Sequence, residues 1–353
     1  MNHTYSLTEL KSIPIFFIVG KGRSGTTLLS TILDSHTEVA SATESRFLLL
    51  VWQKYKSLKV WKPEMAQEFY DTVLSDFRVD YHWEFEDHFV SELKKLPTET
   101  KVQELIKMVY IFKKSLFEKD KIKYIIDKNP RYTLFVDLIH HIFSDGKFIR
   151  IIRDPRDNVT SSIKYNKSKC DAIGFKWTKY NQLLDKFEKK GRPITTMKFE
   201  DLVLDKAAFF EKFEAYTGID SLLSVEHKRL NIKEQFVEKL SDAHKKQHAA
   251  SVKPMDKSKI GHYKKKLNST QIAKVESVSF PYAEIFGYKT ENEIDKLPFK
   301  RLLRLKLRFI YNLYANRIVY NLPYTMMIKA RSFVLKYILK NKLNRYKSMS
   351  VGK

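Results

Sequence analysis

A glycine-rich loop is the part of this sequence whose residue types and spacing best fit a chemical role. Gly20-Lys-Gly-Arg-Ser-Gly-Thr-Thr27 follows an apolar run and precedes a helical pattern, with glycines spaced as in a nucleotide phosphate loop. The free N–H groups and positive dipole end of such a helix attract an anion. Thr26 stands where ATP-binding loops place a lysine, and Arg23 offers a cation from the other side of the loop. The pattern therefore favours a ligand with one phosphate to hold and no obligatory Mg²⁺.

Polar residues also follow other apolar runs that predict strands. The predicted strands are 13–19, 124–126, 147–152 and 194–199, and each precedes a helical pattern. This alternation predicts an α/β fold with a P-loop-like central parallel β-sheet flanked by helices. Such a sheet binds its ligand beyond the carboxyl ends of the strands. The residues expected there are Gly20 to Thr27, Asp127 to Pro130, Arg153 to Arg156, and Glu200 with Asp201.

A helical insertion, roughly residues 44–117, separates the first two predicted strands. Its stretch from Phe47 to Phe89 holds eleven aromatic residues, a strong local excess over the 13% of the whole chain. Two interpretations remain open. The rings either bury a small core of the insertion itself or wall a pocket for an acceptor molecule.

The C-terminal segment differs in composition from the rest of the chain. Residues 296–353 carry fifteen Lys and Arg and no Asp or Glu, so they supply +15 of the net charge of +24. Stretches 302–310 and 333–340 are both apolar and basic, as in helices on an anionic membrane, or in a helical hairpin packed on the main domain. We predict a main domain over residues 1–289 and a basic amphipathic helical tail over residues 290–353. Charge confined to a tail argues against a nucleic-acid partner.

Several motifs, taken in order, resemble one enzyme family. Gly22-Arg-Ser-Gly-Thr-Thr-Leu-Leu29 is similar to the 5′-phosphosulfate loop of sulfotransferases that use 3′-phosphoadenosine 5′-phosphosulfate (PAPS). The stretch 22–46 most resembles protein-tyrosine sulfotransferases and their bacterial relatives. Further similarity lies in 127–130, 151–161, 197–202 and 257–263, so the resemblance covers about residues 13–289. It implies transfer of a sulfuryl group from PAPS to a hydroxyl acceptor, a sterol or other lipid alcohol, a glycan or a tyrosine, which gives a sulfate ester and 3′-phosphoadenosine 5′-phosphate (PAP).

The resemblance also implies which residues carry the reaction. Glu44 falls on the position of the general base in the tyrosine-specific branch, although a glutamate there would also suit the first turn of the insertion's helix. Lys128 and Arg23 would stabilise the charge on the sulfonate and the bridging oxygen. The implied donor-binding residues are Arg23, Ser24, Gly25, Thr26, Thr27, Arg153, Ser161, Lys257 and Ser258, of which Arg153 and Ser161 would read the 3′-phosphate.

Composition limits the remaining classes of function. The single cysteine, Cys170, forms no internal disulfide, and no Cys/His cluster has zinc spacing. Because the implied cations Lys128 and Arg23 can do what Mg²⁺ does for kinases, we expect no metal. Because no apolar run reaches the roughly 20 residues that span a bilayer, we expect a cytoplasmic protein, with peripheral attachment at the inner face of the membrane through its tail. The alternatives are a phosphate-loop small-molecule kinase that uses ATP and a non-enzymatic binder of membrane surfaces. Thr26 in place of the loop lysine argues against the kinase.

Overall fold

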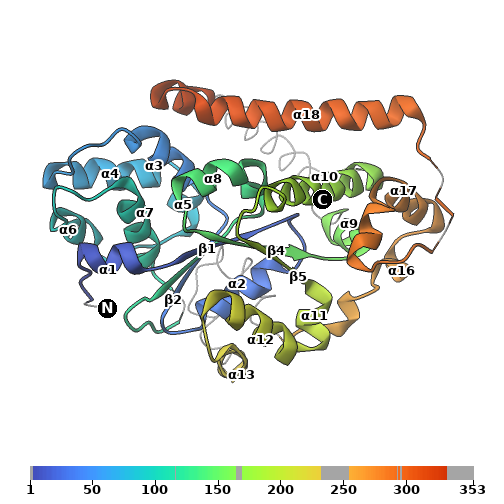
Figure 1. Ribbon diagram of the computed structural model, residues 1–353, viewed down its shortest axis with the longest axis horizontal. Coiled ribbons are helices and arrows are strands. Elements are labelled where there is room, and N and C mark those ends of the chain that lie inside the picture. The colour runs from blue at the N-terminus through green and yellow to red at the C-terminus, as the bar shows by residue number, and fades with distance from the viewer. Residues whose placement is uncertain are drawn as a thin grey trace, which may run out of the picture.

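The computed structural model describes residues 3–115, 117–163, 169–231, 254–291, 293–294 and 296–331. In this part of the chain, five parallel strands form one sheet in the order β2-β3-β1-β4-β5 (Figure 1). Their bounds are β1 Ile15–Val19, β2 Val39–Thr43, β3 Tyr124–Lys128, β4 Lys147–Ile152 and β5 Ile194–Lys198. The α/β fold with a central parallel sheet predicted from the sequence is therefore confirmed.

Strand β2 was not predicted from the sequence. Its residues, Val-Ala-Ser-Ala-Thr, include only two β-branched side chains and none of the long apolar ones that mark β1. It lies at the edge of the sheet and pairs with β3 alone, with Thr43 beside Lys128. The insertion therefore begins directly after a strand, which gives Glu44 a place at the carboxyl edge of the sheet.

Helices cover both faces of the sheet, and alternate residues of each strand face opposite cores. Phe16 and Ile18 of β1 pack with one set of helices, whereas Phe17 and Val19 pack with the other. The first face is covered by α2 (Thr26–Asp34), α11 (Phe199–Leu204), α12 (Lys206–Thr217) and α13 (Leu222–Asn231). The second is covered by α7 (Val102–Ile111), the 3₁₀ helix η2 (Pro130–Phe135), α8 (Val136–Ile142) and α10 (Cys170–Glu188).

The insertion folds as a group of short helices with a core of its own. Its helices are α3 (Phe47–Tyr55), η1 (Pro63–Met65), α4 (Ala66–Leu74), α5 (Phe77–His82), α6 (Phe89–Lys94) and α7. Seven of its eleven aromatic side chains from Phe47 to Phe89 are buried: Phe47, Tyr55, Trp61, Phe69, Trp83, Phe85 and Phe89. Most of the aromatic excess is thus accounted for by packing inside the insertion.

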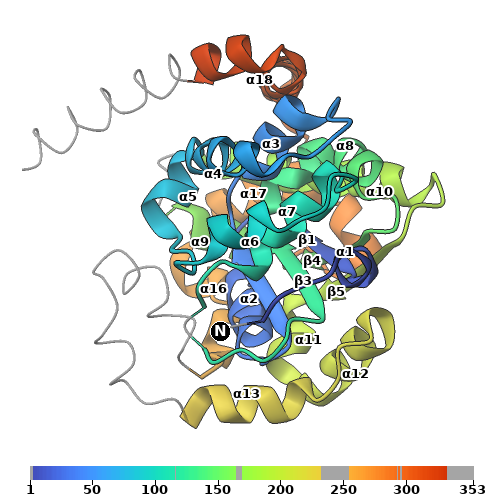
Figure 2. The same cartoon turned by 90° about the vertical axis from the view of Figure 1, so that its left-hand side faces the viewer.

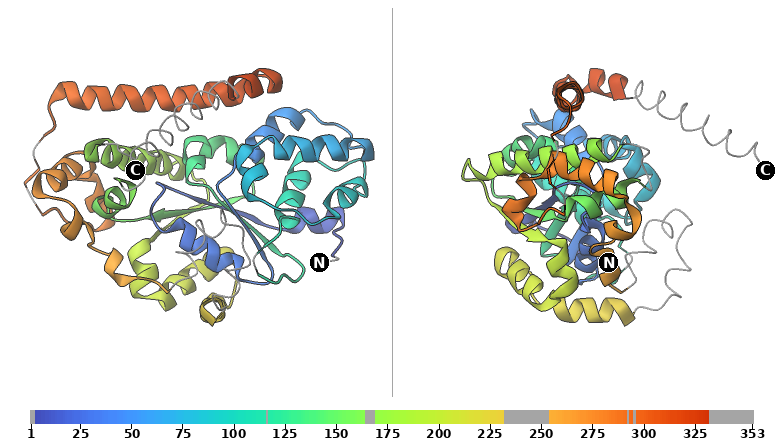
Figure 3. Two further views of the ribbon diagram at one scale, coloured as in Figure 1. Left: turned by 180° about the vertical axis from the view of Figure 1, so that it is seen from behind. Right: turned by 90° about the vertical axis from the view of Figure 1, so that its right-hand side faces the viewer.

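The remaining elements flank this body. They are α1 (Leu7–Ser12), α9 (Pro155–Ile163), η3 (Lys257–Lys259), α16 (Tyr263–Lys266), α17 (Ser269–Ser279), η4 (Tyr282–Phe286) and α18 (Phe299–Asn321). Helix α18 forms an outermost layer above α3 and α10, on the side of the sheet opposite to α12 and α13 (Figures 2 and 3). None of the helices in the described ranges is long and apolar enough to cross a bilayer.

Helix α18 is docked on the main body along one face. Arg301 Nε lies 2.6 Å from Asp171 Oδ2 on α10, and the Tyr320 ring meets that of Phe135 at a centroid distance of 5.2 Å. The structure therefore shows this part of the basic tail packed on the domain. The second amphipathic stretch predicted from the sequence, residues 333–340, lies outside the described residues.

Candidate active site

The glycine-rich loop forms the turn from β1 into α2 and presents unpaired backbone donors. Gly25 is the N-cap of α2, and the N–H groups of Gly25, Thr26 and Thr27 donate to no other residue that the structure describes. Gly25 has a φ of +83°, and a Cβ atom there would lie 2.2 Å from Cδ2 of Phe199. The loop thus requires glycine at this position and leaves the helix N-terminus free to bind an anion.

Polar contacts within the protein hold the loop in this shape. Asn158 Nδ2 on α9 donates to Gly22 O at 3.0 Å and to Ser24 Oγ at 3.1 Å. Ser24 Oγ donates to Lys21 O at 2.8 Å, and Thr133 Oγ1 accepts the N–H of Gly20 at 2.9 Å. Sequence reasoning missed Asn158, although it lies in the same motif as Arg153 and Ser161. Such pre-ordering removes a conformational cost from ligand binding.

Glu44 and Lys128 meet beside this loop at the ends of neighbouring strands. Lys128 Nζ lies 3.5 Å from Glu44 Oε1 and 3.3 Å from Thr27 Oγ1, while Arg78 Nη1 on α5 donates to Glu44 Oε2 at 2.9 Å. The N-cap of the first insertion helix is Arg46. Glu44 therefore pairs with two cations and does not cap that helix. Arg78 was not identified from the sequence, because 34 residues separate it from Glu44.

The charges of this pair set its protonation. Burial raises the pKa of the Glu44 carboxyl, but Lys128 and Arg78 outweigh burial and bring that pKa below its ordinary value. Burial lowers the pKa of the Lys128 ammonium, and Glu44 offsets this only in part. An ionised carboxylate next to a buried ammonium group can accept a proton while the ammonium group stabilises negative charge.

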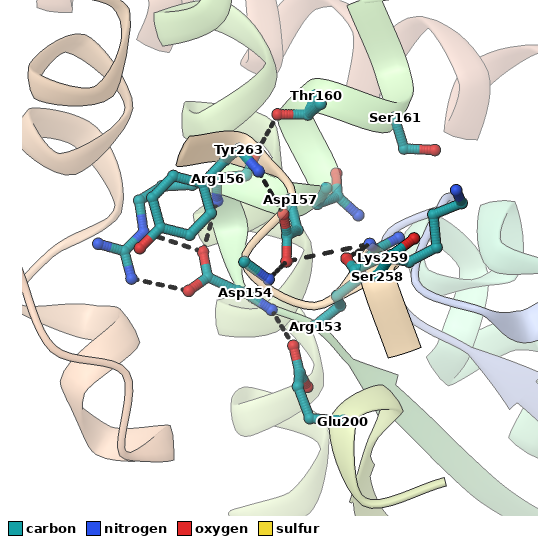
Figure 4. A network of polar contacts seen from close by, with 12 residues as sticks. Arg153, Asp154, Arg156, Asp157, Thr160, Ser161, Glu200, Ser258, Lys259 and Tyr263 are labelled. Carbon is teal, nitrogen blue, oxygen red and sulfur yellow. Dashed lines mark hydrogen bonds and ion pairs between the residues drawn. The ribbon is translucent and has the colours of Figure 1, made fainter. Parts of the chain in front are cut away.

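Arg153 and Ser161 lie on the other side of the loop, after β4 and on α9. Arg153 Nη2 donates to Lys259 O at 2.6 Å (Figure 4), and its guanidinium lies 4.5 Å from the centroid of the Phe199 ring. Its buried Nε has no hydrogen-bond partner among the residues that the structure describes. Ser161 Oγ accepts from Arg23 Nε at 3.1 Å. The structure thus brings Arg23, Arg153 and Ser161 together into one cationic cluster with an unused donor.

A buried ion-pair network braces this cluster. Arg156 binds both oxygens of Asp154 (Figure 4). It also donates to Glu276 Oε1 on α17 at 2.7 Å. Asp157 accepts the N–H groups of Gly261 and Tyr263 at 2.8 and 2.9 Å, which ties the segment before α16 to α9. This network fixes both the start of α9 and the segment that approaches Arg153.

Lys257 and Ser258 lie in that covering segment, in the short helix η3. Both are exposed, and the Ser258 N–H donates to Asp256 Oδ1 at 2.9 Å. The contact to Arg153 is made by the carbonyl of Lys259. Their role in nucleotide binding therefore stays a prediction.

A cavity of about 300 Å³ opens beyond the strand ends, next to Glu44 and Arg23. The aromatic rings that line it are Phe175 and Tyr180 of α10 and Phe309 of α18. The insertion contributes only Glu44, so the idea that its rings wall an acceptor pocket stays a prediction. The described ranges contain no group of three or more His, Cys, Asp or Glu side chains that could hold a metal ion.

The sequence of this chain is similar to those of known sulfotransferases. A family model described as "Sulfotransferase family" matches residues 14–222. Rat protein-tyrosine sulfotransferase 1 is 24% identical over 200 residues, which cover 54% of this chain and 44% of that protein. Omega-hydroxy-beta-dihydromenaquinone-9 sulfotransferase of Mycobacterium tuberculosis (strain CDC 1551 / Oshkosh) is 25% identical over 252 residues, which cover 58% of this chain and 63% of that protein.

The matched region is thus a part of each relative: the chain spans about half the length of the curated relatives it matches. Among solved structures, the sulfotransferase domain of the Synechococcus PCC 7002 olefin synthase aligns with a TM-score of 0.46 and 17% identity. That alignment covers 82% of this chain and 98% of that domain.

Proposed function

The chain belongs to the sulfotransferase family, and from this premise we propose that it transfers a sulfuryl group from PAPS to the hydroxyl group of an acceptor. The observation that carries the proposal is the Glu44–Lys128 pair, held at 3.5 Å beside the N-terminus of α2. One group accepts a proton, the other stabilises developing charge, and the loop offers donors for a phosphate. These are the three functions that transfer of an already activated group requires.

The residues of the donor side fit a nucleotide with phosphates at two positions. Unpaired N–H groups of Gly25, Thr26 and Thr27 suit the 5′-phosphosulfate, and the hydroxyl groups of both threonines add further donors. Arg153 and Ser161 suit the 3′-phosphate, because the buried Nε of Arg153 lacks a partner in the described part of the chain. PAPS would supply the activated sulfuryl group there.

The chain's own groups then move one proton and stabilise one leaving group. Glu44 takes the proton of the acceptor hydroxyl while the oxygen of that hydroxyl forms a bond to sulfur. The bond from sulfur to the 5′-phosphate oxygen breaks, and its electron pair stays with PAP. Lys128 and the loop N–H groups stabilise the charge that this oxygen gains, as cations and oriented amides do in phosphoryl transfer. The proposed division of the chain at residue 289 would leave all these groups in one domain.

A calorimetric titration tests the donor. We expect PAP to bind more tightly than ATP, with or without Mg²⁺, and ³⁵S from labelled PAPS to appear in a sulfate ester. Preferential binding of Mg²⁺-ATP, with transfer of its γ-phosphate, would contradict the proposal and favour the kinase. Loss of sulfuryl transfer with a chelator, restored by Mg²⁺, would contradict the metal-free mechanism.

We also propose an anionic membrane surface as a partner of α18. Its outward side carries a stripe of exposed apolar and aromatic side chains at helical spacing: Phe299, Leu303, Leu307, Ile310, Tyr311, Tyr314 and Ile318. Exposed Lys300 and Arg304 stand among them, and this combination is typical of helices that lie on anionic lipid.

Vesicle sedimentation tests this partner. Leu307→Glu should reduce binding to phosphatidylglycerol vesicles, because it places a negative charge within the apolar stripe. Val60→Glu is the matched control, since Val60 is a similarly exposed apolar side chain outside α18. Equal binding to phosphatidylglycerol and phosphatidylcholine, or equal effects of the two substitutions, would contradict the proposal.

A further inference from the structure

The cavity beside Glu44 is lined by an excess of cations. Five basic side chains reach it, Lys21, Arg23, Arg131, Lys176 and Arg308, against a single acidic one, Glu44. The carboxylate of Glu44 is engaged by Lys128 and Arg78. Glu44 is thus the only acidic side chain among the described residues that line the cavity.

Three of these cations come from elements that carry no residue assigned to the donor. Arg131 lies on η2, Lys176 on α10 and Arg308 on α18. The side chains of these three form no ion pair or hydrogen bond with any residue in the described ranges. The residues assigned to the donor lie in the loop, at the ends of β3 and β4, on α9 and in η3. We therefore assign the three cations on η2, α10 and α18 to the acceptor side of the cavity.

Gathering like charges around one space has an energetic cost that an anion would relieve. Burial together with Lys176 and Arg23 lowers the pKa of Lys21 to about 8, and burial with Arg308 lowers the pKa of Lys176. Ser162 points to the same conclusion independently. It lines the cavity, its side chain is buried, and its hydroxyl has no hydrogen-bond partner among the described residues.

We propose that this cavity binds an anionic group of the acceptor, with Lys176 and Arg308 as its main ligands. The preferred acceptor is then an alcohol that carries a phosphate, sulfate or carboxylate, held against the rings of Phe175 and Phe309 with its hydroxyl toward Glu44. This inference rests on the proposed function for the identity of the reaction, but the anion site itself can be tested by binding alone.

Two fluorescent naphthols that differ by one anionic group provide the test. We would titrate 6-hydroxynaphthalene-2-sulfonate and 2-naphthol into the full chain, with and without PAP, at pH 7. The sulfonate should bind roughly tenfold or more tightly than 2-naphthol, as expected for charge-assisted contacts. Added salt should reduce this preference.

Variants assign the preference to particular side chains. Lys176→Gln and Arg308→Ala should each reduce affinity for the sulfonate by roughly fivefold or more while leaving that for 2-naphthol unchanged. Arg304→Ala is the matched control, because it removes an exposed cation from the same helix but does not line the cavity. Equal affinities for both naphthols would overturn the inference, as would equal effects of Arg304→Ala and Arg308→Ala.

Two further comparisons distinguish sources of the anion. Label from PAPS should enter glucose 6-phosphate in preference to glucose if the acceptor is a small molecule, and phosphatidylglycerol in preference to diacylglycerol if it is a lipid. Preference for the neutral member of either pair would overturn the inference. If PAP fails to bind while the sulfonate preference persists, the proposed function fails and the anion site stands. If PAP binds and the preference is absent, only the anion site fails.

Discussion

Replacing Glu44 with glutamine separates a catalytic role of this side chain from a structural one. The amide keeps the shape of the carboxylate, but it accepts a proton poorly and carries no charge. A general base typically contributes about 10²–10⁴-fold, so we expect the turnover number to fall by that factor. This corresponds to roughly 2.7–5.5 kcal/mol in the activation free energy, at about 1.36 kcal/mol for each tenfold.

The structural cost of Glu44→Gln is a separate quantity and is measured separately. The contact with Arg78 is partly exposed, so its loss should cost about 0.2–1 kcal/mol in the free energy of unfolding. Lys128 is only 2% exposed, and a buried charge that loses its charged partner costs up to about 3–5 kcal/mol. Urea unfolding measures these losses, whereas the turnover of the folded enzyme does not contain them.

The assay follows ³⁵S from labelled PAPS into 2-naphthol and 6-hydroxynaphthalene-2-sulfonate, with PAP affinity measured by calorimetry. Glu38→Gln is the matched control, because Glu38 stands just before β2 and pairs with Lys123 away from the loop. It should leave turnover unchanged. A loss of turnover below tenfold in Glu44→Gln, or an equal loss of PAP affinity, would show that Glu44 is structural.

Three other substitutions probe the donor side and the cavity. Arg153→Ala should weaken PAP binding by about 1.5–3 kcal/mol but leave adenosine 5′-monophosphate binding unchanged; calorimetry showing equal losses would refute this role. Gly25→Ala should abolish PAP binding, because its Cβ would collide with Phe199, whereas Gly218→Ala, where φ is +77° and no atom lies within 4 Å of the added Cβ, should only reduce stability. Binding of naphthalene-2-sulfonate should weaken as pH rises through about 8, because Lys21, which faces Lys176, Arg23 and Glu44, then loses its charge. Lys21→Arg should remove that dependence on pH. The same pH profile in the variant and the unchanged protein would contradict the role of Lys21.

The sequence predicts four strands because three of them have apolar runs and the fourth, Ile-Thr-Thr-Met-Lys of β5, is rich in β-branched residues. Ile-Phe-Phe-Ile-Val of β1 is buried throughout, as strands covered on both faces must be. The polar and small residues of β2 carry no such pattern, and only pairing with β3 defines this strand. Site residues were found for the same reason, since Lys128 and Arg153 follow recognisable strands and lie at one edge of the sheet.

The acceptor side could not be predicted in this way. Its cavity depends on contacts between segments far apart in the chain, such as the ring of Phe309 against that of Phe175. No local periodicity of the sequence predicts such a contact. The sequence also does not distinguish basic residues of α18 that face solvent from those that face the cavity. Arg308 and Arg304 are four residues apart, yet only Arg308 lines the cavity.

The order of the strands also sets the distances between the groups proposed to contact the donor. Along its carboxyl edge stand Glu44 after β2, Lys128 at the end of β3, the loop after β1 and Arg153 after β4. Neighbouring strands lie about 4.8 Å apart, so roughly 14 Å separates the first of these positions from the last. Backbone hydrogen bonds fix this length, and helices or loops can vary without changing it. A donor one strand spacing too short would reach Lys128 or Arg153, but not both.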